Sequence, residues 1–143
     1  MAQFVIGLAI VVCGFVGARW PSSVRAALAV VGVTVLAAGV VLFALGASAL
    51  GPSLTPYPRP SEGAMLRERG IYRRVRHPIY GGVLLAAIGW SLARSPLALL
   101  ATGLLWLLLE LKSRHEESML LERYPQYEAY RSRVRRRFVP AVY

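Results

Sequence analysis

Two short segments of the chain contain most of the side chains that could take part in chemistry. The first, residues 70–82, is basic and aromatic and ends in an apolar run that Pro78 opens. The second, residues 110–117, follows another apolar run and mixes acidic with basic residues. Ionisable groups beside membrane segments are costly and usually functional. The candidates are Tyr72, Arg76, His77 and Tyr80 in the first segment, and Glu110, Lys112, Arg114, His115, Glu116 and Glu117 in the second.

The composition predicts that both segments belong to a small integral membrane protein. Of the 143 residues, 56% are hydrophobic, and the mean hydropathy is positive, which is too apolar for an ordinary soluble domain. At this length we expect one domain over residues 1–143. We divide it into an N-terminal helical hairpin (1–50), a Pro-rich and basic cytoplasmic connector (51–77), and a hairpin with a C-terminal helix (78–143).

The predicted fold is all-α: a polytopic bundle of about four transmembrane helices. Glycines at 32, 39 and 46 recur every seven residues and predict close helix packing. The fourth apolar segment should continue as a helix beyond the membrane, because neither Gly nor Pro occurs from Glu110 until Pro125. Aromatic residues near helical spacing in residues 117–137 predict an amphipathic helix along the membrane surface. The four apolar segments are residues 2–18, 24–50, 78–93 and 96–111.

The basic residues predict the orientation and exclude several functions. The chain has 17 basic and 7 acidic residues, and fourteen of the basic ones lie in residues 59–76 and 112–137. The positive-inside rule puts both blocks in the cytoplasm, so we expect a multi-pass protein of the bacterial inner membrane with both termini cytoplasmic. Membrane lipids can bind these blocks, whereas nucleic-acid binding is not expected. Cys13 is the only cysteine, and no metal-ligand spacing is present.

In their order along the chain, three groups of residues resemble the signatures of the isoprenylcysteine carboxyl methyltransferase family, with phospholipid N-methyltransferases as relatives. The resemblance covers roughly residues 51–140. The first group is Gly70, Tyr72, Arg76, His77, Pro78, Tyr80 and Gly82, with Gly81 as an alternative for the last glycine; the second is Lys112, Arg114, Glu116, Glu117, Leu120, Leu121, Tyr127 and Tyr130; the third is Arg137, Phe138, Val139 and Pro140.

This resemblance implies a cytoplasmic pocket for S-adenosylmethionine, closed by the chain that follows the last membrane helix. Such a cofactor needs hydrogen-bond donors for its carboxylate, an aromatic surface for adenine and a dry environment for its sulfonium. An imidazole and tyrosines at the head of a helix suit these needs. The cofactor-binding residues implied by the family are Met65, Leu66, Arg67, Tyr72, His77, Pro78, Ile79, Tyr80 and Glu117.

The resemblance also implies a catalytic pair, which aligns with Lys112 and Glu116. Lysine stands where the family has arginine and loses the bidentate fork, so Arg114 is the alternative cation. The acceptor is expected to be lipophilic and to enter from the bilayer. A carboxylate, as in an isoprenylcysteine or another apolar or prenylated molecule, is favoured over a phospholipid amine.

A function from another class remains open at this stage. A non-catalytic membrane protein could bind anionic lipid or a partner protein through its basic faces. In that case His77 would make only a structural hydrogen bond, and Tyr72 and Tyr80 would be interfacial aromatic residues. Glu110 could be satisfied by pairing with Arg114.

Overall fold

The computed structural model describes residues 2–51 and 69–140, and in these residues every regular element is helical. Five α-helices and a short 3-10 helix follow one another: α1 (Ala2–Val16), α2 (Ser22–Leu50), η2 (Gly70–Arg73), α3 (Pro78–Arg94), α4 (Pro96–Arg123) and α5 (Tyr127–Arg133). The all-α prediction is confirmed for these residues. Most of the predicted connector, including Met65, Leu66 and Arg67, lies outside the described residues.

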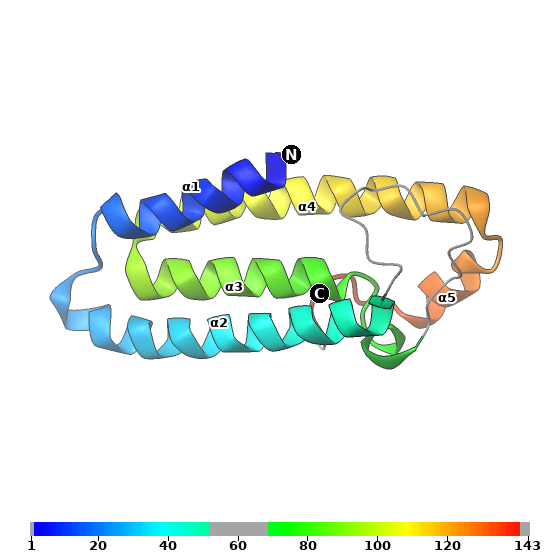
Figure 1. The fold of residues 1–143 in the computed structure, drawn as a ribbon, viewed down its shortest axis with the longest axis horizontal. Coiled ribbons are helices and arrows are strands. Elements are labelled where there is room, and N and C mark those ends of the chain that lie inside the picture. The colour runs from blue at the N-terminus through cyan, green and yellow to red at the C-terminus, as the bar shows by residue number, and fades with distance from the viewer. Residues whose placement is uncertain (1, 52–68, 141–143) are drawn as a thin grey trace.

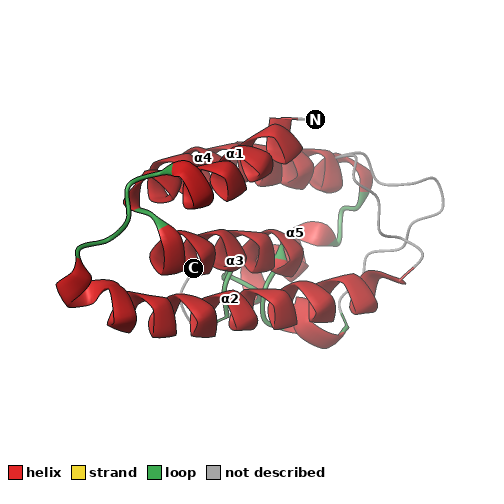
Figure 2. Cartoon of the chain, turned by 60° about the vertical axis from the view of Figure 1, so that its left-hand side comes forward, coloured by secondary structure: helices red, strands yellow, loops and turns green. Residues whose placement is uncertain are grey.

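The four long helices lie side by side with α3 in the middle (Figures 1 and 2). α2 packs along one side of α3, whereas α1 and α4 pack against each other and against α3. Prolines fix two helix starts, since Pro78 and Pro96 occupy the first turns of α3 and α4, where a missing N–H costs nothing. The α3–α4 hairpin returns the chain to the end of the bundle where α3 began.

The predicted close packing of the glycines is confirmed at the contact between α2 and α3. A Cβ added to Gly39 would lie 2.4 Å from the backbone nitrogen of Ala86, and one added to Gly82 would lie 2.5 Å from that of Phe43. The two helices thus approach backbone to backbone, which a larger residue would prevent. Gly32 and Gly89 make comparable approaches, and a Cβ on Gly46 would lie 2.8 Å from the Ile79 side chain.

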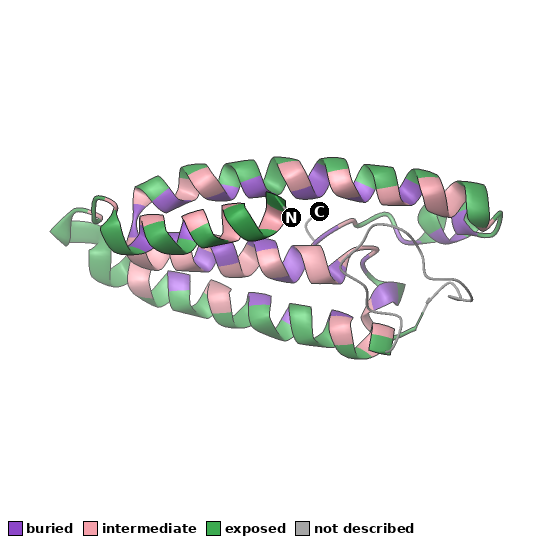
Figure 3. Ribbon diagram, turned by 45° about the horizontal axis from the view of Figure 1, so that its top comes forward, coloured by how far each residue is buried: buried purple, intermediate pink, exposed green. Residues whose placement is uncertain are grey.

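Figure 3 shows exposed residues along the outward sides of α1, α2 and α4, and many of these exposed residues are large and apolar. Two helices, α2 and α4, are long and apolar enough to cross a membrane; at 1.5 Å per residue the 29 residues of α2 extend over about 43 Å. α1 and α3 are shorter, with 15 and 17 residues. Exposed apolar side chains on this scale suit contact with lipid rather than with water. Examples are Phe4, Leu8, Val30, Val40, Leu100 and Leu104.

The predicted amphipathic helix over residues 117–137 is wrong in two respects. First, α4 continues only to Arg123, and Tyr124 is extended at φ −128° and ψ 96°, because the following Pro125 disfavours helical geometry in the residue before it. Second, the apolar side chains of the segment face the protein: Tyr127, Tyr130 and Phe138 are each at most 3% exposed. The segment therefore folds back onto the bundle instead of presenting an apolar face to lipid.

Candidate functional site

The site begins with the turn that leads into α3. Gly70 has φ 59°, a left-handed conformation that favours glycine, and η2 then brings Tyr72 into the interior. His77 stands at the N-cap of α3 but makes no capping hydrogen bond with its side chain. Its imidazole is therefore available to groups on α4.

The C-terminal segment is bound to this turn by its backbone. The amide of Arg76 donates to the carbonyl of Arg136 at 3.0 Å, and the amide of His77 donates to that of Arg137 at 2.7 Å. The Arg76 guanidinium donates to the Val134 carbonyl at 2.6 Å. A Cβ on Gly81 would lie 1.8 Å from the Phe138 carbonyl oxygen, so this approach requires glycine. The chain after α4 is therefore packed against the start of α3.

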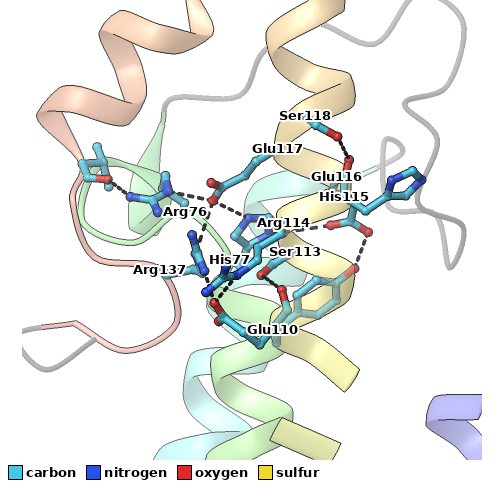
Figure 4. Close-up of polar contacts among 12 residues, drawn as sticks. Arg76, His77, Glu110, Ser113, Arg114, His115, Glu116, Glu117, Ser118 and Arg137 are labelled. Atoms are coloured by element: carbon cyan, nitrogen blue, oxygen red, sulfur yellow. Dashed lines mark hydrogen bonds and ion pairs between the residues drawn. The ribbon is translucent and has the colours of Figure 1, made fainter. Parts of the chain in front are cut away.

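The carboxylate of Glu117 contacts the charged side chains of this turn. Its Oε1 accepts from Arg76 Nε at 2.8 Å and lies 3.0 Å from His77 Nε2, and its side chain is only 5% exposed. Figure 4 shows Glu117 between Arg76, His77 and Arg137. A buried carboxylate is stable only with such partners, so Glu117 fixes the orientation of the imidazole.

Glu116 faces the other side of the same imidazole. Its Oε2 lies 3.7 Å from His77 Nδ1, and its Oε1 accepts a short hydrogen bond of 2.5 Å from the Tyr80 hydroxyl. The rings of His77 and Tyr80 are stacked, with centroids 5.5 Å apart and planes parallel within 1°. The imidazole is therefore held between two carboxylates and against an aromatic face.

Tyr72 contributes a phenol that remains protonated. Burial raises its pKa above the ordinary tyrosine range, and the nearby acidic groups of Tyr130 and Glu116 act in the same direction. Its backbone carbonyl accepts a 2.8 Å hydrogen bond from the Tyr130 hydroxyl. Tyr130 of α5 thus holds the backbone of Tyr72, whose phenol interacts electrostatically with Glu116.

Lys112 joins this group from one turn earlier on α4. Its Nζ lies 5.1 Å from the centroid of the Tyr80 ring, within the range of a cation–π contact. It also donates to Gln3 Oε1 at 2.9 Å. Lys112, Glu116 and Tyr80 therefore form one polar surface, which the first turn of α1 reaches.

Some predicted residues lie elsewhere. Arg114, the alternative cation, pairs with Glu110: its Nε donates to Glu110 Oε1 at 2.8 Å, and its side chain is 67% exposed. The structure therefore does not place the Arg114 guanidinium beside Lys112. The predicted pairing of Glu110 with Arg114 is confirmed, and Arg137 also donates to the same carboxylate. Pro78 is buried in the first turn of α3, whereas Ile79 packs against Gly46 of α2.

Arg76, one of the predicted candidates, holds both Glu117 and the C-terminal segment. Two further residues at the site were not predicted as candidates. Arg137 was only part of a motif. Gln3 was not considered, and its signal was that it is the one amide side chain in an otherwise apolar α1.

Comparison with known proteins bears directly on this geometry. A family model described as phospholipid methyltransferase matches residues 27–127, more than two thirds of the chain. The chain belongs to the phospholipid methyltransferase family. No curated protein matches it.

Members of the phospholipid methyltransferase family use S-adenosylmethionine and group with the membrane methyltransferases that resemble isoprenylcysteine carboxyl methyltransferase. The protein is therefore an S-adenosylmethionine-dependent methyltransferase of the membrane. The candidate site brings together the stacked rings of His77 and Tyr80 and the carboxylate of Glu116. The match begins after α1, so α1 lies outside the part that the family model covers.

Proposed function

We propose that this methyltransferase acts on a lipophilic acceptor that reaches the site from the bilayer. In this proposal the cofactor binds beside Tyr72, His77, Tyr80 and Glu117, and the acceptor binds beside Lys112 and Glu116. Pro78, Ile79 and the segment 65–67 complete the cofactor side by family analogy. The site is contained in a single domain over residues 1–143.

The observation that best supports this proposal is the position of Tyr80. Its ring stacks on His77 and lies near the Lys112 ammonium, while its hydroxyl donates to Glu116. One side chain therefore adjoins both the proposed cofactor side and the proposed acceptor side. Methyl transfer needs this proximity, because the acceptor must lie in line with the methyl group in a site that excludes water.

A carboxylate acceptor suits Lys112. S-adenosylmethionine supplies the methyl group. A carboxylate oxygen forms the new bond to the methyl carbon as the carbon–sulfur bond breaks, and no proton has to move. The ammonium of Lys112 would hold one carboxylate oxygen and leave the other directed at the methyl group. An isoprenylcysteine-like molecule or a fatty acid would present such a group.

A phospholipid amine is the second candidate, and the position of Glu116 favours it. Lys112 and Glu116 are four residues apart on α4 and thus lie on the same face of the helix. A phosphoethanolamine headgroup would place its phosphate at Lys112 and its amine at Glu116. Because an ammonium has no lone pair, it must lose a proton before it attacks, and the Glu116 carboxylate could accept that proton.

We further propose that all four long helices lie in the membrane, with the charged end of the bundle in the cytoplasm. The supporting observations are the apolar outer surfaces of α1, α2 and α4 and the basic residues at one end. Gln3 and Phe138 both lie near the site, so both ends of the described chain approach it.

The acceptor can be identified by following a labelled methyl group. Purified protein is mixed with S-adenosylmethionine carrying a radioactive methyl group and with phosphatidylcholine vesicles that contain either palmitate or phosphatidylethanolamine. A carboxylate acceptor yields a methyl ester, which alkali hydrolyses to volatile labelled methanol. A methylated amine retains its label in alkali.

The variants Lys112→Met and Glu116→Gln separate the two candidates. Lys112→Met should abolish most ester formation, whereas Glu116→Gln should reduce amine methylation more strongly than ester formation. The exposed Arg74→Met is the control for loss of a positive charge. Label in neither lipid, from a folded protein that binds the cofactor, would contradict this choice of acceptors.

A further inference from the structure

The end of the bundle opposite the candidate site carries a separate group of basic residues. The link between α1 and α2 and the turn between α3 and α4 both lie at this end (Figure 1, left). Arg19 and Arg25 flank the start of α2, and Arg94 is the last residue of α3. In the described residues every acidic side chain lies between Glu110 and Glu128, in the second half of α4 or beyond it. The three arginines therefore have no carboxylate partner in the described part of the chain.

Two aromatic rings hold Arg94 in place. Its guanidinium carbon lies 4.9 Å from the centroid of the Phe15 ring on α1 and 5.4 Å from that of Trp90, one turn earlier on α3. Trp90 also contacts α1, because its indole donates to the Ile10 carbonyl at 3.2 Å. Aromatic faces attract a guanidinium but do not neutralise its charge. Arg94 is therefore a positioned cation that keeps its charge.

Trp20 holds the link between α1 and α2 against the end of α3. Its indole donates to the Ser91 carbonyl at 3.3 Å, and its own carbonyl accepts from Arg25 Nε and Nη2 at 3.2 and 3.0 Å. A guanidinium has five N–H donors, so Arg25 keeps further donors as well as its charge. Since Ser91 lies one turn before Arg94, these contacts connect Arg25 with the end of α3.

A phospholipid phosphate fits this group of cations. The exposed apolar side chains of α1, α2 and α4 extend to Val16, Val24 and Leu97, which are close in sequence to the three arginines. In an integral membrane protein the arginines therefore lie where the apolar surface meets water, and tryptophans are also typical of this depth. Arginine presents pairs of N–H donors that match phosphate oxygens. Basic residues at this depth favour lipids with a net negative charge.

We propose that Arg19, Arg25 and Arg94 bind the phosphate-bearing headgroup of an anionic phospholipid, which connects the α1–α2 link to the α3–α4 turn. The inference goes beyond the proposed function, because it depends neither on the methyl acceptor nor on the position of the cofactor. The bound lipid joins α1, which lies outside the family match, to the hairpin that carries the site.

Tryptophan fluorescence can detect this lipid, because Trp20 and Trp90 both lie beside the arginines. The third tryptophan, Trp106, is 43% exposed and is removed by Trp106→Phe. The full chain is reconstituted in vesicles of phosphatidylcholine with a minor fraction of phosphatidylglycerol. In one preparation the phosphatidylglycerol carries bromine on its acyl chains, and in the other an equal amount of phosphatidylcholine does. Bromine quenches tryptophan at short range, so the difference measures the preference for the anionic lipid.

We expect brominated phosphatidylglycerol to quench the Trp106→Phe protein more strongly than brominated phosphatidylcholine does. Arg94→Met in this background should lower the preference for the anionic lipid about fivefold, the effect of one arginine at a membrane surface. Arg25→Met should lower it in the same way, whereas Arg94→Lys keeps the charge and should retain more of it. Arg74→Met is the matched control, because it removes an exposed arginine from the turn before α3, and it should leave the quenching unchanged.

Four results would overturn the proposal. The first is equal quenching by the two lipids, strong or weak. The second is an equal loss of preference in Arg94→Met and Arg74→Met, which would mean diffuse attraction to the net charge of +10. The third is an equal loss in Arg94→Lys and Arg94→Met, since charge would then not bind the lipid. The fourth is loss of the preference when inorganic phosphate is present on both sides of the vesicle, which would assign the arginines to a soluble anion.

Discussion

The buried polar groups at the two ends of the α3–α4 hairpin have different kinds of bonding partners. At the turn, Ser91 and Thr102 donate to carbonyls four residues earlier in their own helices, at 2.8 and 2.9 Å, and contact each other at 2.9 Å. At the open end, Arg76 and His77 reach Glu117 from 41 and 40 residues away, and Arg76 also reaches the carbonyl of Val134. The buried hydroxyls near the turn thus make neutral contacts within the hairpin, whereas the open end uses charged contacts between distant segments.

This difference indicates which end has been shaped for function. A hydroxyl bonded within its own helix needs no other element and costs little to bury. Buried charges cost several kcal/mol each unless their partners are well placed, and clusters of this kind occur preferentially at functional sites. The charged end is therefore the candidate functional end, and the hydroxyl end serves to hold the hairpin together.

The largest expected effect comes from breaking the charged end at Arg76. Arg76→Met should lower the free energy of unfolding by about 3–5 kcal/mol, because it leaves the buried Glu117 carboxylate without its closest cation. The effect would be measured by unfolding in detergent. Arg74→Met removes an equal charge from an exposed position and should change stability little. Equal stability of the two variants would refute the role given to Arg76.

A smaller effect is expected where the C-terminal segment meets α3. Gly81→Ala forces a methyl group against the Phe138 carbonyl and should cost about 1–3 kcal/mol, as overpacking does. It should also release the C-terminal segment, which limited proteolysis would detect. Gly103→Ala on α4 is the control, because a Cβ there meets nothing within 4 Å. If Gly81→Ala resists protease as well as this control does, the proposed close approach is wrong.

The smallest effect is expected at the turn end. Thr102→Val removes the hydroxyl that contacts Ser91 and the Ala98 carbonyl, while Ser91 keeps its bond to the Ala87 carbonyl. The expected cost is about 0.6 kcal/mol, typical of a polar contact between membrane helices, with no change in cofactor binding. A marked loss of cofactor binding in a stable Thr102→Val protein would mean that the two ends are not separate in function.

Much of the fold could be predicted because its signals are local. Pro78 and Pro96 mark two helix starts, and the spacing of Gly32, Gly39 and Gly46 predicts a close helix contact. The continuation of the fourth apolar segment as a helix toward Pro125 was predicted and is confirmed, because α4 ends at Arg123. The helix expected over residues 117–137 was wrong, because the spacing of its aromatic residues fitted a helix that Pro125 interrupts. The inward direction of Tyr127 and Tyr130 depends on tertiary packing and could not be read from that spacing.

The site could be predicted as a set of residues but not as a set of partners. Its motifs brought His77, Tyr80, Lys112, Glu116 and Glu117 forward together. Which glutamate faces which imidazole nitrogen depends on the rotation of α4 relative to α3, and helical spacing within α4 does not determine that rotation. The contacts of Arg76 with backbone carbonyls and of Lys112 with Gln3 have no local pattern, because each joins segments more than 50 residues apart.

The central claim is that His77, held between Glu116 and Glu117, is part of the pocket for S-adenosylmethionine. The most direct test is a calorimetric titration of the purified protein with this cofactor, beside His77→Ala and the control His115→Ala, which alters an exposed histidine on α4. We predict saturable binding by the wild type and His115→Ala, and binding weakened at least about tenfold in His77→Ala, as the loss of one charge-assisted hydrogen bond would give. Equal affinity of folded His77→Ala and wild type would contradict the claim.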